Sequence, residues 1–135
     1  MATVRLLSDD ELSADARAVF DDIRKVRKSD FVNNFWRALA HDPKTLRRTW
    51  DSIKEVMAPG ALDPKTKEML YVAVSIAHGC SYCIHSHTAA ARAKGMTEAE
   101  YGELLAIVGM AAETNRLVTA LGVPVDEAFL VDAAD

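Results

Sequence analysis

Helix-start signals recur along this chain, and they constrain its fold more than any other feature. Asp42-Pro43 and Asp63-Pro64 each place an N-cap carboxylate before a proline at the first helical position. Ser8-Asp9-Asp10-Glu11 and Thr97-Glu98-Ala99-Glu100 each fit a capping box, in which two side chains satisfy the free amides of the first turn. No segment alternates polar and apolar residues over the length of a strand. These signals predict an all-α fold.

The spacing of apolar residues predicts a bundle of about six helices. Leu12, Ala16, Val19, Ile23 and Val26 continue one face of the helix that we expect to follow Ser8, and Leu46, Trp50, Ile53 and Met57 form the buried stripe of the helix after Asp42. The helix after Asp63 is apolar on most sides, so we expect it to be central. The expected helices cover about residues 9–27, 31–40, 43–58, 64–78, 80–94 and 98–121, followed by a weakly specified tail.

Length and charge restrict the classes of protein that this chain can belong to. A chain of 135 residues is expected to form a single domain, 1–135, because that length suits one hydrophobic core. A hydrophobic content of 50% and a charged content of 27% are typical of a globular protein. The net charge of -4 argues against nucleic acid and against an anionic membrane surface as partners.

The N-terminal region lacks an apolar stretch of signal-peptide length. The most apolar runs, Met69 to Ala77 and Leu104 to Ala112, are shorter than a membrane span. We therefore expect a cytoplasmic protein without a membrane partner. In that compartment a Cys-x2-Cys pair is more often catalytic or metal-binding than structural.

The chemistry of the chain is concentrated in four residues, Glu68, Cys80, Cys83 and His87. Cys80 and Cys83 are the only cysteines, and a base follows four positions after Cys83. A helix that begins near Cys80 places both cysteines and His87 on one face. This combination predicts a redox-active thiol site.

Glu68 lies on the preceding helix, and helix geometry brings it back toward His87. From Glu68 to the turn at Gly79 the chain descends about 15 Å, and from Ser81 to His87 it climbs about 9 Å. If the two helices are antiparallel neighbours, the axial offset is only about 6 Å. The carboxylate and the imidazole can span this offset directly or through one water, so the spacing is compatible with a contact between them.

The residues also indicate a mechanism. Free amides and the macrodipole at a helix start stabilise a thiolate, so a thiol there has a lowered pKa. His87 would take the thiol proton, and Glu68 would orient the imidazole and stabilise its charge. One thiolate would attack a peroxide to give a sulfenic acid, and the second cysteine would then close a disulfide. Position at the helix start alone favours Cys80 as the attacking thiol.

Other interpretations of these residues stay open. The cysteines could be buried hydrophobic residues, or could bind zinc with His87 or His85, although a second ligand pair of the usual spacing is absent from the sequence. We expect no bound metal. His85 lies off the catalytic face and, with Tyr82, is named only as a residue that could line the site. A redox-sensing or thiol–disulfide exchange protein of the same fold, with little peroxidase turnover, is the alternative to a peroxidase.

The four site residues match the signature of alkylhydroperoxidase D-like proteins of the carboxymuconolactone decarboxylase superfamily. The flanking segments Leu62-Asp63-Pro64, Ala73 to Ala77 and Ala89 to Gly95 are also similar to that family. The clear resemblance covers about residues 61–95, and a looser resemblance covers the core, about residues 34–121.

This resemblance implies a helical peroxidase that reduces alkyl or hydrogen peroxides. It makes Cys83 the attacking thiol, Cys80 the resolving thiol, and Glu68 with His87 a proton relay that acts partly through Cys80. The family's founding branch has a histidine where this chain has Tyr82. Muconolactone decarboxylation is the weaker function, because that branch does not depend on a Cys-x2-Cys pair.

The resemblance also implies partners. A peroxidase of this kind binds no cofactor and needs an external dithiol reductant, either a lipoylated protein or a thioredoxin-type donor. Homo-trimers, or hexamers built from trimers, are implied as well. The aromatic segment with Phe31, Phe35 and Trp36 and the alanine-rich helix agree with this expectation, because they offer more apolar surface than one small domain readily buries.

Overall fold

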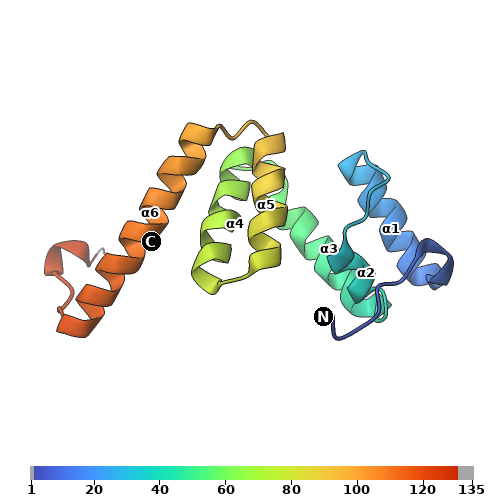
Figure 1. The fold of residues 1–135 in the computed structure, drawn as a ribbon, viewed down its shortest axis with the longest axis horizontal. Coiled ribbons are helices and arrows are strands. Elements are labelled where there is room, and N and C mark those ends of the chain that lie inside the picture. The colour runs from blue at the N-terminus through green and yellow to red at the C-terminus, as the bar shows by residue number, and fades with distance from the viewer. Residues whose placement is uncertain (1, 131–135) are drawn as a thin grey trace. The chain divides into compact units, whose positions relative to one another are not determined.

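The computed structural model describes residues 2–130, and these residues form six α-helices and two short 3-10 helices without any strand (Figure 1). The predicted all-α fold is confirmed. The chain divides into two compact units, Met1–Ala58 and Pro59–Asp135, which are described separately. The single-domain organisation expected over 1–135 stays a prediction.

The first unit contains η1 (Asp9–Glu11), α1 (Ala14–Arg27), α2 (Asn34–Leu39) and α3 (Pro43–Met57). Asp42 caps α3 as predicted, accepting hydrogen bonds from the backbone N–H groups of Lys44 and Thr45. Trp36 and Trp50 meet edge to face, with ring centroids 5.6 Å apart. The buried residues of this unit form one apolar cluster: Leu7, Leu12, Ala16, Val19, Phe20, Ile23, Val32, Trp36, Ala40, Leu46 and Trp50.

The start of the first long helix was predicted at the wrong serine. Ser8 begins only the short η1, with its backbone N–H donating to the Glu11 carboxylate at 2.8 Å. Leu12 is then extended, and Ser13 caps α1 by accepting from the backbone N–H of Ala16 at 3.2 Å. The chain therefore begins a new helix, α1, at a second capping serine five residues after the first. Val26, expected on the buried face, is exposed at the other end of α1.

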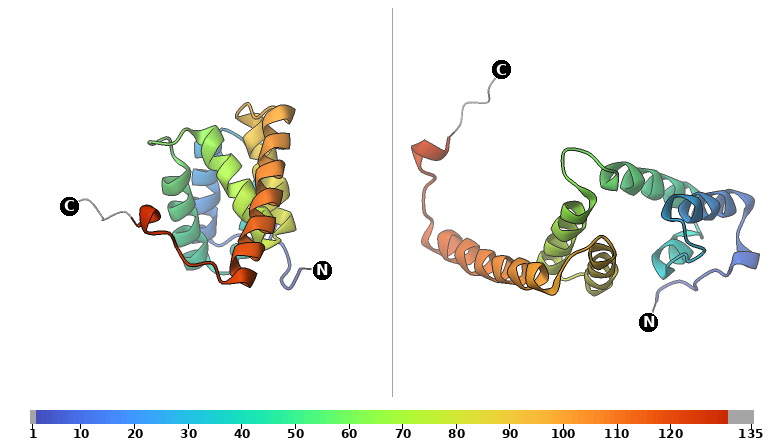
Figure 2. Two further views of the ribbon diagram at one scale, coloured as in Figure 1. Left: turned by 90° about the vertical axis from the view of Figure 1, so that its left-hand side faces the viewer. Right: turned by 90° about the horizontal axis from the view of Figure 1, so that it is seen from above.

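The second unit contains α4 (Pro64–His78), α5 (Ser81–Ala93), α6 (Glu98–Leu121) and η2 (Glu127–Phe129). Helices α4 and α5 are antiparallel neighbours, joined by the turn at Gly79 (Figure 1). The predicted N-caps Asp63 and Thr97 accept from the backbone N–H groups of Thr66 and Glu100. Helix α6 is continuous along its length (Figure 2). Gly122, which follows its last residue, adopts the left-handed conformation.

Apolar side chains of the second unit are mostly exposed on the single chain. Leu70 and Val74 point outward from α4, so the prediction that this helix is central is wrong for these positions. In α6 only Leu104 is buried. The large apolar side chains exposed along α6 are Leu105, Ile107, Met110, Leu117, Val118 and Leu121. The hydrophobic pattern of α4 and α6 therefore exceeds what this unit covers by itself.

By length and composition alone, α6 could also cross a membrane. It has 24 residues, and its best 18-residue window has a mean hydropathy of 1.3. The uninterrupted apolar run from Leu104 to Ala112, from which a length shorter than a membrane span was inferred, is only part of this helix. Isolated charged and polar residues break that run without ending the helix.

Candidate active site

The turn between α4 and α5 positions the two cysteines. Gly79 has φ of 69°, a left-handed conformation that favours glycine and ends α4. The backbone N–H of Cys80 then bonds to the carbonyl of Ser75, and Cys80 becomes the N-cap of α5. Cys80 thus lies at the start of α5, and Cys83 lies in its first turn.

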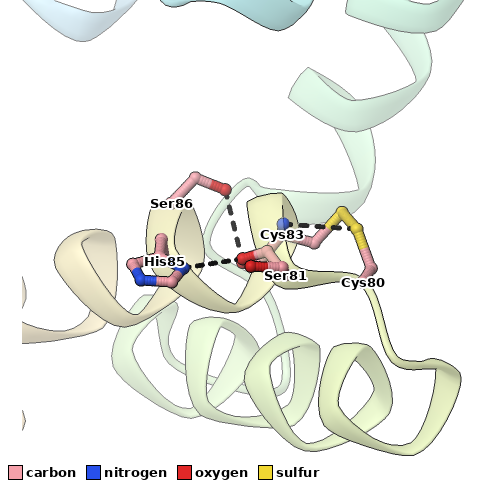
Figure 3. The surroundings of a disulfide bond; sticks show 5 residues. All are labelled: Cys80, Ser81, Cys83, His85 and Ser86. Atoms are coloured by element: carbon pink, nitrogen blue, oxygen red, sulfur yellow. Dashed lines mark hydrogen bonds between the residues drawn. A yellow bond between two sulfur atoms is a disulfide. The ribbon is translucent and has the colours of Figure 1, made fainter. Parts of the chain in front are cut away.

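Cys80 and Cys83 form a disulfide, with their Cα atoms 5.3 Å apart. Figure 3 shows the bond at the start of α5, where the backbone N–H of Cys83 donates to the Cys80 sulfur at an N–S distance of 3.3 Å. In a helix N-cap this acceptor position is usually occupied by an oxygen of Ser, Thr, Asp or Asn. A thiolate on Cys80 would occupy the same position, facing the amides and the positive end of the helix dipole.

Glu68 and His87 are joined directly across the α4–α5 pair. The distance from Glu68 Oε2 to His87 Nδ1 is 2.7 Å, as the antiparallel geometry predicted. Glu68 is buried, with 6% of its surface exposed. A buried carboxylate at this position requires partners, because an unpaired charge is costly in a poorly solvated place.

A second donor, Lys94, holds the other oxygen of Glu68, with Nζ 3.1 Å from Oε1. Burial acts to raise the pKa of Glu68, but the hydrogen bonds from His87 and Lys94 act in the opposite direction. The net result is a pKa below the ordinary value of 4.5. Glu68 is therefore a carboxylate at neutral pH, and the Nδ1 of His87 donates to it.

Tyr71 fixes the plane of the His87 ring. The two rings are stacked, with centroids 3.6 Å apart and an interplanar angle of 18°. Because Nδ1 is bound to Glu68, a neutral His87 keeps its lone pair at Nε2. The carboxylate and the stacked phenol together hold an imidazole that can accept a proton at Nε2.

His85 and Tyr82 lie outside this hydrogen-bonded group. His85 Nδ1 is 2.8 Å from the carbonyl oxygen of Ser81, to which it donates, and its ring lies on the side of Ser81 away from the sulfurs (Figure 3). Both His85 and Tyr82 are exposed. The expectation that they line the site stays a prediction.

The structure brings together Glu68 with His87, and Cys80 with Cys83, on two antiparallel helices. Among residues 2–130, no hydrogen bond joins His87 to either sulfur. In the disulfide form neither sulfur carries a proton for His87 to accept. Within the same residues, no three His, Cys, Asp or Glu side chains group as a metal site would require. The arrangement suits thiol–disulfide chemistry with a nearby base.

Sequence reasoning missed Tyr71 and Lys94. Tyr71 lies three positions after Glu68, and Lys94 lies seven positions after His87, so both share a helix face with a predicted site residue. That spacing was the available signal. It is weak, because tyrosines and lysines at helical spacing are common on ordinary surfaces.

Comparisons with known proteins identify the family of the chain. The carboxymuconolactone decarboxylase family profile matches residues 43–126. "Uncharacterized protein 4 in cox locus" of Paracoccus denitrificans is 40% identical over 52 residues, which cover 38% of this chain and 47% of that protein. The match thus spans about half the length of that relative.

A solved structure is similar over nearly the whole chain. It is described as the alkylhydroperoxidase AhpD core from Rhodospirillum rubrum, with 67% identity and a TM-score of 0.94 over 98% of this chain and 99% of that chain. The fold therefore corresponds to that of AhpD. The chain belongs to the carboxymuconolactone decarboxylase family, as an AhpD-like member.

Proposed function

We propose that this protein is a hydroperoxide reductase that works through the Cys80–Cys83 pair. The observation that carries the proposal is the 2.7 Å hydrogen bond between Glu68 and His87. His87 belongs to α5, the helix that begins at the cysteine pair. A buried carboxylate–imidazole pair close in sequence to two thiols supplies the base that a thiol nucleophile requires. The similarity to an alkylhydroperoxidase core supports the same conclusion.

The reaction starts from the reduced protein. The thiolate of Cys83 attacks the terminal oxygen of a hydroperoxide, so that an S–O bond forms and the O–O bond breaks. The leaving alkoxide, or hydroxide from hydrogen peroxide, takes up the proton that the thiol released and departs as alcohol or water. Cys83 is left as a sulfenic acid.

Cys80 then resolves the sulfenic acid. Its sulfur attacks the Cys83 sulfur, the disulfide forms, and the sulfenic oxygen leaves as water. The two electrons given to the peroxide come from the two thiols. The backbone N–H of Cys83, which is 3.3 Å from the Cys80 sulfur in the disulfide, would stabilise the thiolate form of Cys80.

His87 and Glu68 form the proton relay in this proposal. His87 accepts the thiol proton at Nε2, partly by way of Cys80, and returns it to the leaving oxygen. Glu68 holds Nδ1 and stabilises the imidazolium that forms. Tyr71 holds the His87 imidazole in its stacked orientation during both proton transfers.

An external dithiol completes the cycle. It attacks the disulfide, forms a mixed disulfide, and leaves as its own disulfide while both cysteines return to thiols. We propose a lipoylated or thioredoxin-type protein as this donor, and no bound cofactor. Cytoplasmic location and the absence of a nucleic-acid partner are parts of the same proposal.

We also propose that the exposed apolar face of α6 is covered by further copies of the chain, in a trimer or a hexamer. A membrane is the less favourable alternative, because α6 carries Glu103, Glu113 and Arg116. Each charged residue near the centre of a bilayer costs about 2.5–3.5 kcal/mol on insertion scales. At the rim of a protein interface the same charges stay hydrated.

A redox sensor is the second candidate function. Tyr82 favours it, because this position precedes Cys83 and carries no second imidazole for proton transfer. A sensor would form the same disulfide and then transmit it to a partner without rapid turnover.

Steady-state reduction of cumene hydroperoxide with a panel of dithiols separates these functions. An enzyme consumes many equivalents of peroxide per chain with at least one reductant, and a Cys83→Ser control consumes none. One equivalent per chain, followed by no further consumption with every reductant, would show a sensor. A reduced protein whose thiols survive peroxide treatment would overturn both functions.

A further inference from the structure

Lys94 occupies a defined place beside the site. It is the C-cap residue of α5, and its backbone N–H bonds to the carbonyls of Ala90 and Ala91. Its Nζ lies 3.1 Å from Glu68 Oε1, whereas His87 holds Oε2 of the same carboxylate. His87 and Lys94 are about two helical turns apart, so the carboxylate bridges two points on one face of α5.

The charges of this trio determine how readily His87 takes a proton. A buried Glu68 whose only partner is His87 would favour the imidazolium, because the ion pair removes an uncompensated charge. The ammonium of Lys94 already compensates the carboxylate. A proton on His87 then adds a second positive charge beside Lys94, and this disfavours the imidazolium.

We propose that Lys94 is a positioning residue, which neutralises and orients the Glu68 carboxylate that it shares with His87 and so limits how strongly this carboxylate favours the imidazolium. The consequence for the reaction rests on the proposed function, in which only a neutral His87 can accept the thiol proton. Lys94 itself touches neither peroxide nor sulfur in this role. It sets the charge and the geometry of the pair that does the proton transfer.

Two other cations of α4 and α5 bind carboxylates of α6. Helices α5 and α6 both pack on α4. Lys65 of α4 binds Glu100 of α6 at 2.7 Å, and Arg92 of α5 binds Glu98 of α6 at 3.0 Å. Lys67 immediately precedes Glu68 in α4. Tyr71 of α4 faces the His87 ring itself, with which it stacks.

Proton NMR of the histidine C2–H signals in the oxidised full chain tests this inference without relying on activity. His87→Asn identifies the His87 signal among the four histidines. In Lys94→Met the titration midpoint of His87 should rise by about 0.5 to 1 pH unit, a Coulomb shift already reduced for the half-exposed ammonium. Lys94→Arg, which keeps the charge, should stay close to the wild type.

Lys65→Met is the matched control, because it removes the same charge and also breaks a salt bridge between helices of this unit. Its His87 midpoint should move by less than half of the Lys94→Met shift. Equal shifts in the two variants, or an unmoved midpoint in Lys94→Met, would overturn the inference.

Alkylation of the reduced thiols between about pH 5 and 9 separates this inference from the proposed function. If both the inference and the proposed function hold, Lys94→Met raises the pH at which the alkylation rate begins to increase. This shift should match the shift in the NMR titration midpoint of His87. If the NMR midpoint moves and the alkylation profile does not, the inference about Lys94 stands and the relay role of His87 fails.

Discussion

The two units of this chain bury different kinds of side chain. In the first unit the interior is an apolar cluster built from α1, α2 and α3, with Trp36, Phe20 and Ile23 almost fully buried. In the second unit the buried residues include Glu68, Ser75 and Thr88, while most large apolar residues of α6 face outward. Among the described residues, all the buried ones of the first unit are apolar, whereas the second unit buries these polar residues together with Val72, Ala91, Met96 and Leu104.

This difference follows from the physical chemistry of burial. An apolar interior stabilises a unit in proportion to the area removed from water. A buried carboxylate stabilises it only when hydrogen bonds replace the lost hydration, as the bonds from His87 and Lys94 do for Glu68. The second unit therefore holds reactive groups at some cost in stability, and its outward apolar faces leave room for stabilisation by other copies.

The largest expected effect is the loss of all peroxide chemistry on substitution within the second unit. Cys83→Ser should abolish sulfenic acid formation at any pH, a decrease of at least about 10³-fold. Cys80→Ser should instead let Cys83 accumulate sulfenic and then sulfinic acid. Mass spectrometry of peroxide-treated protein measures both outcomes. Sulfenic acid on Cys80 in the Cys83→Ser variant would reverse the assignment of the two thiols.

A matched pair of substitutions tests the contrast in burial directly. Ile23 is 0% exposed in the first unit, and Ile107 is 68% exposed in the second. Ile23→Ala should lower the free energy of unfolding by about 2–5 kcal/mol, independently of protein concentration. Chemical denaturation of both variants over a range of concentrations provides the measurement.

Ile107→Ala should behave differently if further copies cover α6. Its destabilisation should be within about 0.5 kcal/mol for the dissociated chain and should grow as the protein concentration rises. Light scattering should then show a weakened trimer or hexamer. A wild type that is monomeric at micromolar concentration would contradict the proposed assembly.

The rate losses caused by substituting the relay residues should be coupled rather than additive. His87→Asn should slow oxidation by hydrogen peroxide at neutral pH by about 10²-fold, the lower end of the range for general acid–base catalysis. Glu68→Gln plus His87→Asn should cost little more than the worse single change, because the two groups act as one unit. Single-turnover rates of the three variants test this coupling, and additive losses would show that the residues act independently.

The smallest expected effect is on the pH dependence of stability. The pKa of Glu68 is lowered in the folded chain, so its stabilising contribution is present above the ordinary value of 4.5 and is lost as the pH falls through the folded value. The difference in unfolding free energy between wild type and Glu68→Gln should therefore shrink as the pH falls below about 4.5. Urea denaturation at several pH values measures the difference, and a constant difference would contradict the charged state assigned to Glu68.

Much of the fold could be predicted because its boundaries are set locally. Asp42, Asp63 and Thr97 begin the helices that the sequence predicts, and Gly79 and Gly122 end the last two of these helices. The start of α1 was missed because two serines compete as caps five residues apart. The exposure of Leu70 and Val74 could not be predicted, because a hydrophobic helix face does not indicate whether its own chain or another covers it.

The candidate site was predictable to the extent that it depends on helical periodicity. The rise along two antiparallel helices brought Glu68 to His87, and the CxxC spacing brought the sulfurs together. Lys94 and Tyr71 were missed because their residue types carry no distinctive chemistry at that spacing. Their contribution depends on side-chain directions that only the folded chain fixes.

The pH profile of thiol alkylation in reduced wild type and His87→Asn decides whether the Glu68–His87 pair acts as a base for the cysteines. His87→Asn should move the midpoint of the alkylation rate to higher pH. At high pH, where the thiolate forms unaided, the two proteins should react at similar rates. Superimposable profiles would show that the pair does not act on the thiols and that His87 is a structural neighbour of a plain cysteine pair.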